Sequence, residues 1–161
     1  METPVAAAPS AFSLRRLLAE RLTEAHLPDL RRMDAEPGET AAYLEHNLAH
    51  WAEHGFGIWI LRDPPSGRVV GRAGLRHLTV EGVSEVELAF ALLPEFRGRG
   101  LATDAARACV TIGLEWLGLP SLVALALPEN LACQRVLRKA ALIPEREVAH
   151  AGAPHLLYRT D

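Results

Sequence analysis

The stretch from residue 85 to residue 116 constrains the fold more than any other part of the chain. Residues 85–93 (EVELAFALL) have the composition of a strand, and Pro94 follows them directly. A glycine-rich loop comes next, at residues 97–102 (RGRGLA), and apolar residues then recur at helical spacing as far as Trp116. A strand that passes through such a turn into a helix leaves backbone N–H groups without partners at the positive end of the helix dipole. The stretch therefore predicts an anion site at the start of a helix.

The loop has residues that suit a diphosphate. Gly98 and Gly100 let the main chain approach an anion without side chains in the way, and Arg97 and Arg99 add positive charge. It is not a Walker loop, because no Gly-Lys-Ser/Thr follows, and it lacks the third glycine of a dinucleotide fingerprint. On its own, the pattern leaves an ordinary turn as the alternative to a phosphate site.

The remaining elements predict an α+β domain. We expect further strands at residues 12–18, 57–62, 68–79, 122–127, 145–150 and 155–160. We expect further helices at residues 24–33 after a Thr23 cap, from a Thr40 cap to Gly55, and from residues 128–130 through Lys139. Residues 122–127 (LVALAL) are almost wholly apolar, as is typical of a strand covered on both faces, so this strand should be central.

Composition bounds the class of protein. The 161 residues, 49% of them hydrophobic and 23% charged, fit one globular domain, which we place at residues 12–161 after a disordered tail at residues 1–11. A formal charge of -3 gives no strong positive field, so a nucleic acid is not an expected partner. Two cysteines fit a reducing compartment, and we expect a cytoplasmic protein because neither a signal peptide nor a membrane span is evident.

A family resemblance extends these observations. Residues 92–108 (LLPEFRGRGLATDAARA) resemble the acyl-CoA-binding segment of the GNAT acetyltransferases, whose motif is Gln/Arg-x-x-Gly-x-Gly/Ala. Arg97, Gly100 and Ala102 match it. The resemblance runs from about Leu14 to Arg159 and is closest to the RimJ/RimL branch, which acetylates ribosomal-protein N-termini. The segments that carry it are HWAEHGFGIWIL, VELAFALLPEFRGRG, LPENLACQRVLRKAAL and AHAGAPHLLYR.

The resemblance implies a single-domain GNAT fold and an acetyl-CoA donor. Its mixed, mostly antiparallel sheet would have six to seven strands, splayed after the fourth, and about four flanking helices. Leu92 and Leu93 would bond the pantetheine arm, and Asn130 would face that arm unless it serves only as an N-cap. The pyrophosphate would lie on the loop amides of Arg97, Gly98, Arg99, Gly100, Leu101 and Ala102.

Direct transfer to an amine needs a base and a proton for the departing thiolate. Glu87 is the candidate base, and the alternative is a strand carboxylate that pairs with a nearby Arg. The position where many relatives have a Tyr acid is Leu137, and the Ser of the RimL branch is replaced by Cys133. The Cys133 thiol is the candidate acid, with simple packing as the alternative. The Gly that the family has after this helix is replaced by Ala141, which leaves the turn geometry open.

Several weaker signals remain open. His46, His50 and His54 recur on one helix face, where they could chelate a metal, contact the acceptor together with neighbouring aromatic residues, or simply pack; we expect no metal. Three residues of the final predicted hairpin could likewise contact the acceptor or simply lie in the packing or at the surface: His150, His155 and Tyr158.

The favoured function is acetyl-CoA-dependent N-acetylation of a primary amine, on a protein N-terminus or a small molecule. The alternatives are a non-catalytic acyl-CoA sensor or interaction domain of the same fold, and a nucleotide-phosphate-binding module. Nothing in the sequence identifies the acceptor, and a homodimer remains open.

Overall fold

One mixed sheet runs through the part of the chain that the structure, a computed structural model, describes, which is residues 7–33 and 39–161. Its eight strands lie in the order β1-β2-β3-β4-β5-β6-β8-β7. The strands are β1 (Ala11–Ser13), β2 (Leu18–Arg21), β3 (Ile58–Arg62), β4 (Val69–Val80), β5 (Val83–Leu92), β6 (Val123–Ala126), β7 (Leu142–His150) and β8 (Ala153–Thr160). The α-helices of these residues are α1 (Leu27–Met33), α2 (Thr40–His54), α3 (Leu101–Thr111) and α4 (Leu131–Lys139). The α+β prediction is confirmed.

The sheet has eight strands instead of the expected six to seven because residues 12–18 are not one strand. The chain reverses within them, and the Leu14 N–H donates to the Leu17 carbonyl at 2.7 Å. β1 and β2 therefore form an antiparallel hairpin, with Phe12 opposite Ala19. Two consecutive exposed arginines, Arg15 and Arg16, occupy the turn, which explains why the strand does not continue there.

The helix predictions needed small corrections. The expected helix at residues 24–33 begins as a 3-10 turn, Glu24–His26, capped by Thr23, and becomes α-helical only at Leu27. Thr40 is the first residue of α2 rather than its cap, since Glu39 occupies the cap position, and Gly55 ends the helix as expected with φ 74°. The helix after the glycine-rich loop is α3, which continues as a π-helical turn at Ile112–Trp116.

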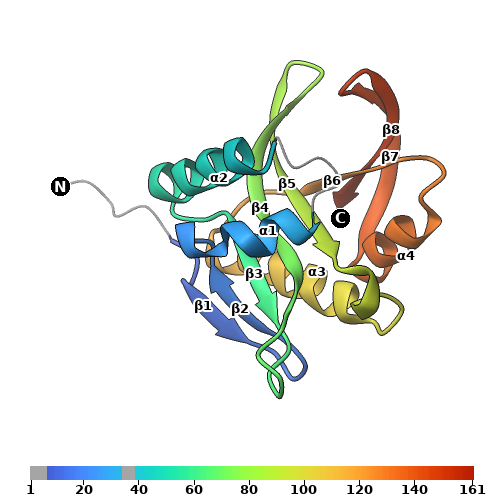
Figure 1. Cartoon of the computed structure of the whole chain (residues 1–161). Coiled ribbons are helices and arrows are strands. Elements are labelled where there is room, and N and C mark those ends of the chain that lie inside the picture. The colour runs from blue at the N-terminus through green and yellow to red at the C-terminus, as the bar shows by residue number, and fades with distance from the viewer. Residues whose placement is uncertain (1–6, 34–38) are drawn as a thin grey trace.

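Two layers of helices cover the sheet (Figure 1), with α1 and α2 in front and α3 behind. The core on the α3 side joins the sheet to the helix through buried residues that include Leu75, Leu88, Ala105, Ala106 and Cys109. A smaller core on the other side contains Leu22, Leu30, Leu44, Ile60 and Val69. The predicted central strand at residues 122–127 is confirmed, because β6 lies between β5 and β8 and most of its side chains are buried.

The sheet is splayed after β5, the strand at which the splay was predicted; it was expected to be the fourth strand and is the fifth because residues 12–18 belong to two strands. β5 pairs with β4 along its whole length, from Val83 opposite Val80 to Leu92 opposite Gly71. With β6 it shares one parallel register position, Glu87 opposite Val123. Beyond that position the two strands diverge, so the end of β5 has a backbone edge that no other strand of residues 7–33 and 39–161 occupies.

An arginine on β8 holds the sheet together just before the splay. The Arg159 guanidinium donates to both carboxylate oxygens of Glu85 on β5 at 2.9 Å, and its Nε donates to Glu145 on β7 at 3.0 Å. These hydrogen bonds raise the pKa of Arg159 above its usual value. Arg159 also lies opposite Val123 in the β6–β8 ladder. Three strands are thereby tied together on the closed side of the divergence.

The described part of the predicted tail packs on the domain. The Ala8 N–H donates to the Gly55 carbonyl at 2.9 Å, and the Trp59 indole N–H donates to the Pro9 carbonyl at 3.0 Å. Residues 1–6 of that tail lie outside the described residues. Among the residues that are described, no helix has the length and apolar character that a membrane crossing requires.

Ala141 comes directly after Ala140, the C-cap of α4, and has a left-handed conformation with φ 68°. This conformation costs a residue with a Cβ roughly 1–2 kcal/mol, whereas glycine adopts it freely but loses about 0.5–1 kcal/mol of extra chain entropy on folding. We therefore expect Ala141→Gly to raise the free energy of unfolding by about 0.5–1 kcal/mol, measured by urea denaturation.

The matched control for this substitution is Ala49→Gly, at an exposed interior position of α2. It should lower the free energy of unfolding by about 1 kcal/mol. Equal destabilisation by both substitutions would contradict the assignment of strain to Ala141.

Candidate functional site

A cavity of about 590 Å³ opens beside the end of β5. Its walls are β5, the glycine-rich loop, the first turn of α3, and α4 with the loop before it. The predicted site residues that line it are Leu92, Arg97, Gly98, Gly100, Leu101, Ala102, Asn130 and Cys133. The structure thus brings together residues from two segments that are about thirty positions apart in the sequence.

The loop presents backbone donors. Gly98 and Gly100 have φ 78° and 80°, in the left-handed region that favours glycine. The Arg97 N–H is used within the preceding turn, where it donates to the Pro94 carbonyl at 3.2 Å. Within the described part of the chain, the N–H groups of residues 98–103 have no hydrogen-bond acceptor. The donors therefore begin at Gly98, one residue later than predicted, and continue into the first turn of α3.

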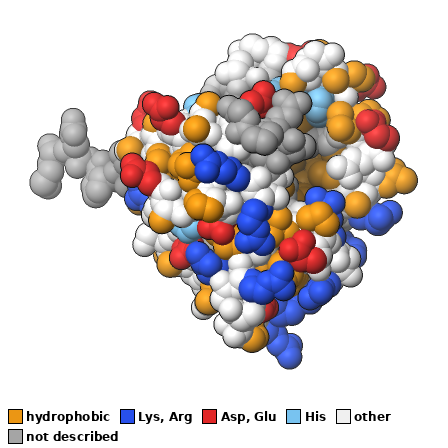
Figure 2. Space-filling view, viewed as in Figure 1, with side chains coloured by type: hydrophobic (Ala, Val, Ile, Leu, Met, Phe, Trp, Pro, Cys, Tyr) orange, Lys and Arg blue, Asp and Glu red, His pale blue; other side chains and the backbone are white. Residues whose placement is uncertain are grey.

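The charge of the cavity lining is positive. Arg97, Arg135 and Lys139 line it, and no Asp or Glu of the described residues does. The Arg97 Nε also donates to the Leu92 carbonyl at 3.1 Å, which fixes its side chain against the end of β5. Figure 2 shows that Lys and Arg side chains gather over the lower part of the molecular face, where α3 begins. These cations and the loop N–H groups suit a polyanionic ligand.

Two predicted cofactor residues do not line this cavity. The Leu93 side chain is buried, and its N–H already donates to the Val70 carbonyl on β4 at 2.9 Å. Arg99 points to the other side of the loop, where its Nη2 donates to the Glu95 carbonyl at 3.1 Å. Asn130 does line the cavity, and it is also the N-cap of α4, since its Oδ1 accepts from the Cys133 N–H at 3.1 Å.

A smaller cavity of about 210 Å³ adjoins the first one. Both cavities are lined by Phe90, Ala91 and Cys133, so they meet where β5 has left β6. The smaller cavity is also lined by Glu87 from β5, by two arginines from β4 and by Tyr43 from α2. The larger cavity is thus lined by positively charged residues, and the smaller cavity, called the small chamber below, is lined by charged and polar side chains and adjoins it where β5 and β6 diverge.

Glu87 is the acidic residue of this chamber. Its side chain is buried, and its Oε2 accepts from the Nε of Arg76 at 3.3 Å across the β4–β5 ladder. Glu87 therefore forms the ion pair with an arginine that was one alternative for it, and its side chain also lines the smaller cavity. Glu85, two residues earlier on β5, is bound to Arg159 and lines neither cavity.

Cys133 lies at the junction of the two cavities, in the first turn of α4. Its side chain is partly buried, and this burial raises the pKa of its thiol. The thiol is consequently protonated at neutral pH and can act as a proton donor rather than as a thiolate nucleophile. Cys109, the other free cysteine, lies on the buried face of α3, and its burial raises the pKa of its thiol to about 12.

Several lining residues were not predicted from the sequence. They are Tyr43, Arg72 and Arg76 in the small chamber, and Thr103, Arg135 and Lys139 in the larger cavity. The guanidinium of Arg72 stacks on the ring of Tyr43, 4.3 Å from its centre. Arg76 was predictable from the β4–β5 hairpin, because a turn at residues 81–82 pairs residue 76 with residue 87.

Two of the three α2 histidines, His50 and His54, form a cluster with His77 of β4 in which one ring nitrogen of each lies within 4.8 Å of the others, whereas His46 is not part of it. His50 is fully used in packing: its Nδ1 is 2.8 Å from the Phe56 carbonyl, and its Nε2 accepts from the His77 N–H at 2.9 Å. Burial lowers the pKa of His50, which favours the neutral ring that these two bonds need. The cluster therefore offers two histidines, rather than three, for any ligand.

Two aromatic residues close to the weaker signals make packing contacts. Trp51 is buried and its indole N–H donates to the Ile58 carbonyl at 2.8 Å. Tyr158 is buried and its hydroxyl donates to Gln134 at 3.2 Å. Neither residue lines the two cavities, and neither do His150 and His155 of the final hairpin.

Comparisons with known proteins agree with this geometry. Residues 11–142 match the family model described as "Acetyltransferase (GNAT) domain". The uncharacterized protein YkkB of Bacillus subtilis is 25% identical over 120 residues, which cover 74% of this chain and 70% of that protein.

Solved structures share the fold over almost the whole chain. A putative GnaT-family acetyltransferase from Bordetella pertussis has a TM-score of 0.85 at 24% identity, covering 95% of this chain and 100% of its own. An acetyltransferase from Agrobacterium tumefaciens has a TM-score of 0.82 at 25% identity, covering 100% and 99%. RimL, described as a ribosomal L7/L12 alpha-N-protein acetyltransferase in complex with coenzyme A, has a TM-score of 0.74 at 14% identity, covering 94% and 96%.

Proposed function

Because this chain belongs to the GNAT acetyltransferase family, we propose that its two joined cavities are the donor and acceptor sites of an acetyl-CoA-dependent N-acetyltransferase. The observation that carries the proposal is the junction of the two cavities beside Cys133, with the buried carboxylate of Glu87 in the inner chamber. A GNAT domain acetylates an amine with acetyl-CoA. The assignment of each task to particular residues is our proposal, as is the extent of the catalytic domain, residues 12–161.

The larger cavity fits acetyl-CoA in charge and shape. The N–H groups of the loop, from Gly98 onward, would hold the pyrophosphate at the start of α3. Arg97, Arg135 and Lys139 would offset the phosphate charges. The edge of β5 near Ala91 and Leu92, which β6 has left, would bond the pantetheine amides as another strand would.

The smaller cavity fits the amine. In the reaction the amine nitrogen bonds to the acetyl carbon, the C–S bond breaks, and the amine loses a proton. Glu87 would accept that proton, directly or through one water, and an α-amino group needs only a modest base because it titrates near pH 8. The Cys133 thiol, kept protonated by burial, would donate a proton to the departing CoA sulfur, and the proton that Glu87 has accepted would return to Cys133 through water, which restores both groups.

The acceptor would be a primary amine, on a protein N-terminus or on a small molecule. A chamber of about 210 Å³ has the volume of about seven water molecules, so it accommodates the reacting end of an acceptor rather than a large one. The RimJ/RimL resemblance supports a protein N-terminus. A structural neighbour described as a spermidine N-acetyltransferase chimera, at 12% identity and a TM-score of 0.72, shows that the same fold also serves a polyamine.

The proposed function predicts both donor binding and turnover. Acetyl-CoA should raise the melting temperature of the protein, and ATP at the same concentration should not. Screening pools of amines and N-terminal peptides should then reveal one class that releases free CoA thiol. Binding without release for every acceptor would indicate an acyl-CoA sensor, and stronger stabilisation by ATP than by acetyl-CoA would indicate a nucleotide-binding module.

The proposed base predicts a loss of turnover in Glu87→Gln, which keeps the size of the side chain. We expect kcat to fall about a hundredfold, at the low end for general base catalysis, while the Kd of acetyl-CoA stays within about twofold. The double variant Arg76→Gln/Glu87→Gln separates catalysis from pairing. Recovery of kcat in the double variant would show that Glu87 acts only as the partner of Arg76.

The proposed acid predicts that Cys133→Ala lowers kcat by at least about tenfold, whereas Cys133→Ser, which keeps an O–H donor, loses less. Cys109→Ala is the matched control, since that thiol is buried in the core: it should lower the melting temperature and leave kcat close to that of the wild type. An unchanged kcat in Cys133→Ala would reduce this thiol to a packing role.

A further inference from the structure

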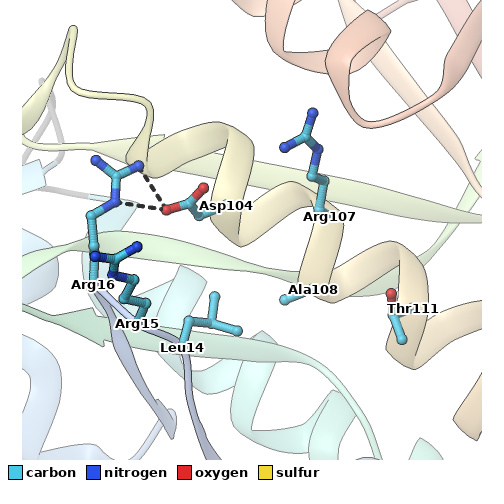
Figure 3. Close-up of a pocket in the computed structure, with 7 residues that line it drawn as sticks. All are labelled: Leu14, Arg15, Arg16, Asp104, Arg107, Ala108 and Thr111. Carbon is cyan, nitrogen blue, oxygen red and sulfur yellow. Dashed lines mark hydrogen bonds and ion pairs between the residues drawn. The ribbon is translucent and has the colours of Figure 1, made fainter.

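Arg16 connects the β1–β2 turn to the glycine-rich loop, although more than eighty residues separate them in the sequence. Its Nη1 donates to the Arg99 carbonyl at 2.7 Å. Its Nε and Nη2 donate to the Asp104 carboxylate on α3 at 3.0 and 2.8 Å. Figure 3 shows Arg16 and Asp104 facing each other at one end of a groove of about 670 Å³ between the turn and α3. This groove is distinct from the two cavities of the proposed active site.

The contact with Arg99 fixes the direction of a peptide group. In a trans peptide the carbonyl of one residue and the N–H of the next point in opposite directions. Because Arg16 holds the Arg99 carbonyl on the groove side of the loop, the Gly100 N–H must point to the other side. Gly100 lines the larger cavity there. Arg16 therefore directs one of the proposed phosphate donors into the site without lining that cavity itself.

The contact with Asp104 fixes the other end of the same turn. The Asp104 N–H donates to the Gly100 carbonyl at 3.1 Å, which closes the first turn of α3. Gly100, with φ 80°, is the residue with the greatest backbone freedom in this turn, and Arg16 contacts the residues on both sides of it. Holding the loop in its binding conformation before the ligand arrives lowers the entropy lost on binding.

Arg16 also offsets an unfavourable charge. Asp104 lies in the first turn of α3, close to where the pyrophosphate is proposed to bind, and a free carboxylate there would repel it. The guanidinium of Arg16 supplies a compensating positive charge through two hydrogen bonds to this carboxylate. The Arg16–Asp104 pair thus stabilises the loop without adding net negative charge to the site.

From this geometry we infer that Arg16 is a positioning residue for the acyl donor: it orients the Gly100 amide and holds the pyrophosphate loop at the start of α3. This inference rests on the proposed function, because it presumes that the loop binds CoA. The residue acts through the loop and does not touch the donor.

The test compares four variants with the wild type by calorimetric titration with CoA and by steady-state kinetics. In Arg16→Ala we expect the Kd of CoA and the KM of acetyl-CoA to rise about tenfold, the lower end for charge-assisted hydrogen bonds, with kcat within about twofold of the wild type. Arg16→Lys keeps the charge but not the fork, so it should recover only part of the affinity. Arg15→Ala is the matched control, since Arg15 lines the same groove and has no contact with the loop among the described residues.

The variant Asp104→Ala tests whether Arg16 positions the loop or only attracts the negatively charged CoA. If Arg16 acted only by its positive charge, removing the carboxylate would strengthen CoA binding; if it positions the loop, Asp104→Ala should weaken binding about threefold. Equal loss of affinity in Arg15→Ala and Arg16→Ala, or a CoA affinity in Arg16→Ala equal to that of the wild type, would overturn the inference. A wild-type protein that does not bind CoA would instead overturn the proposed function.

Discussion

The divergence of β5 from β6 is the constraint on which the proposed site depends. A parallel ladder usually continues with evenly spaced bonds, but here it consists of one position, Glu87 opposite Val123. Buried backbone groups need partners, so the strand edge that β6 leaves is an edge that a ligand with amide groups can complete. The Arg159 bonds to Glu85 and Glu145 hold the sheet closed immediately before this point. The opening is therefore a feature with a defined beginning rather than a frayed strand.

Two glutamates of β5 differ in their contacts because they lie at different distances from the point where β5 and β6 diverge. Glu85 and Glu87 are two residues apart, so they extend from the same face of β5. Glu85 lies on the closed side of the divergence and is bound by both arms of the Arg159 fork, which leaves it a structural role. Glu87 lies at the one position where β5 pairs with β6; its Oε2 accepts from Arg76 at 3.3 Å, and its side chain lines the chamber. A buried carboxylate needs a counter-charge, and Arg76 provides one without enclosing it.

The sequence predicted most of the residues that form the loop side of the larger cavity, the proposed donor site, and few of those that line the smaller cavity, the proposed acceptor site. The donor loop is contiguous, and its glycines, arginines and following helix are all visible in residues 97–116. It did not show that the Arg97 N–H is used in a turn or that Leu93 bonds back to β4, since both depend on hydrogen bonds made outside the motif. Tyr43, Arg72 and Arg76 come from α2 and β4, and only the pairing of strands brings them to Glu87. The β1–β2 hairpin was missed because the apolar residues before and after Arg15 and Arg16 were interpreted as one strand, whereas the chain turns at these two arginines.

This difference between the two sides has a physical basis. A pyrophosphate is a constant feature of the donor, so a local turn with fixed N–H directions can recognise it. The acceptor chamber is assembled from α2, β4, β5, β6 and α4, and each contributes a few side chains that can change without altering a turn or a strand. Arg16 extends the donor side beyond its motif, because the loop keeps its shape through a contact with a distant hairpin. The motif thus predicts which donor binds, whereas the stiffness of the loop depends on residues that lie outside it.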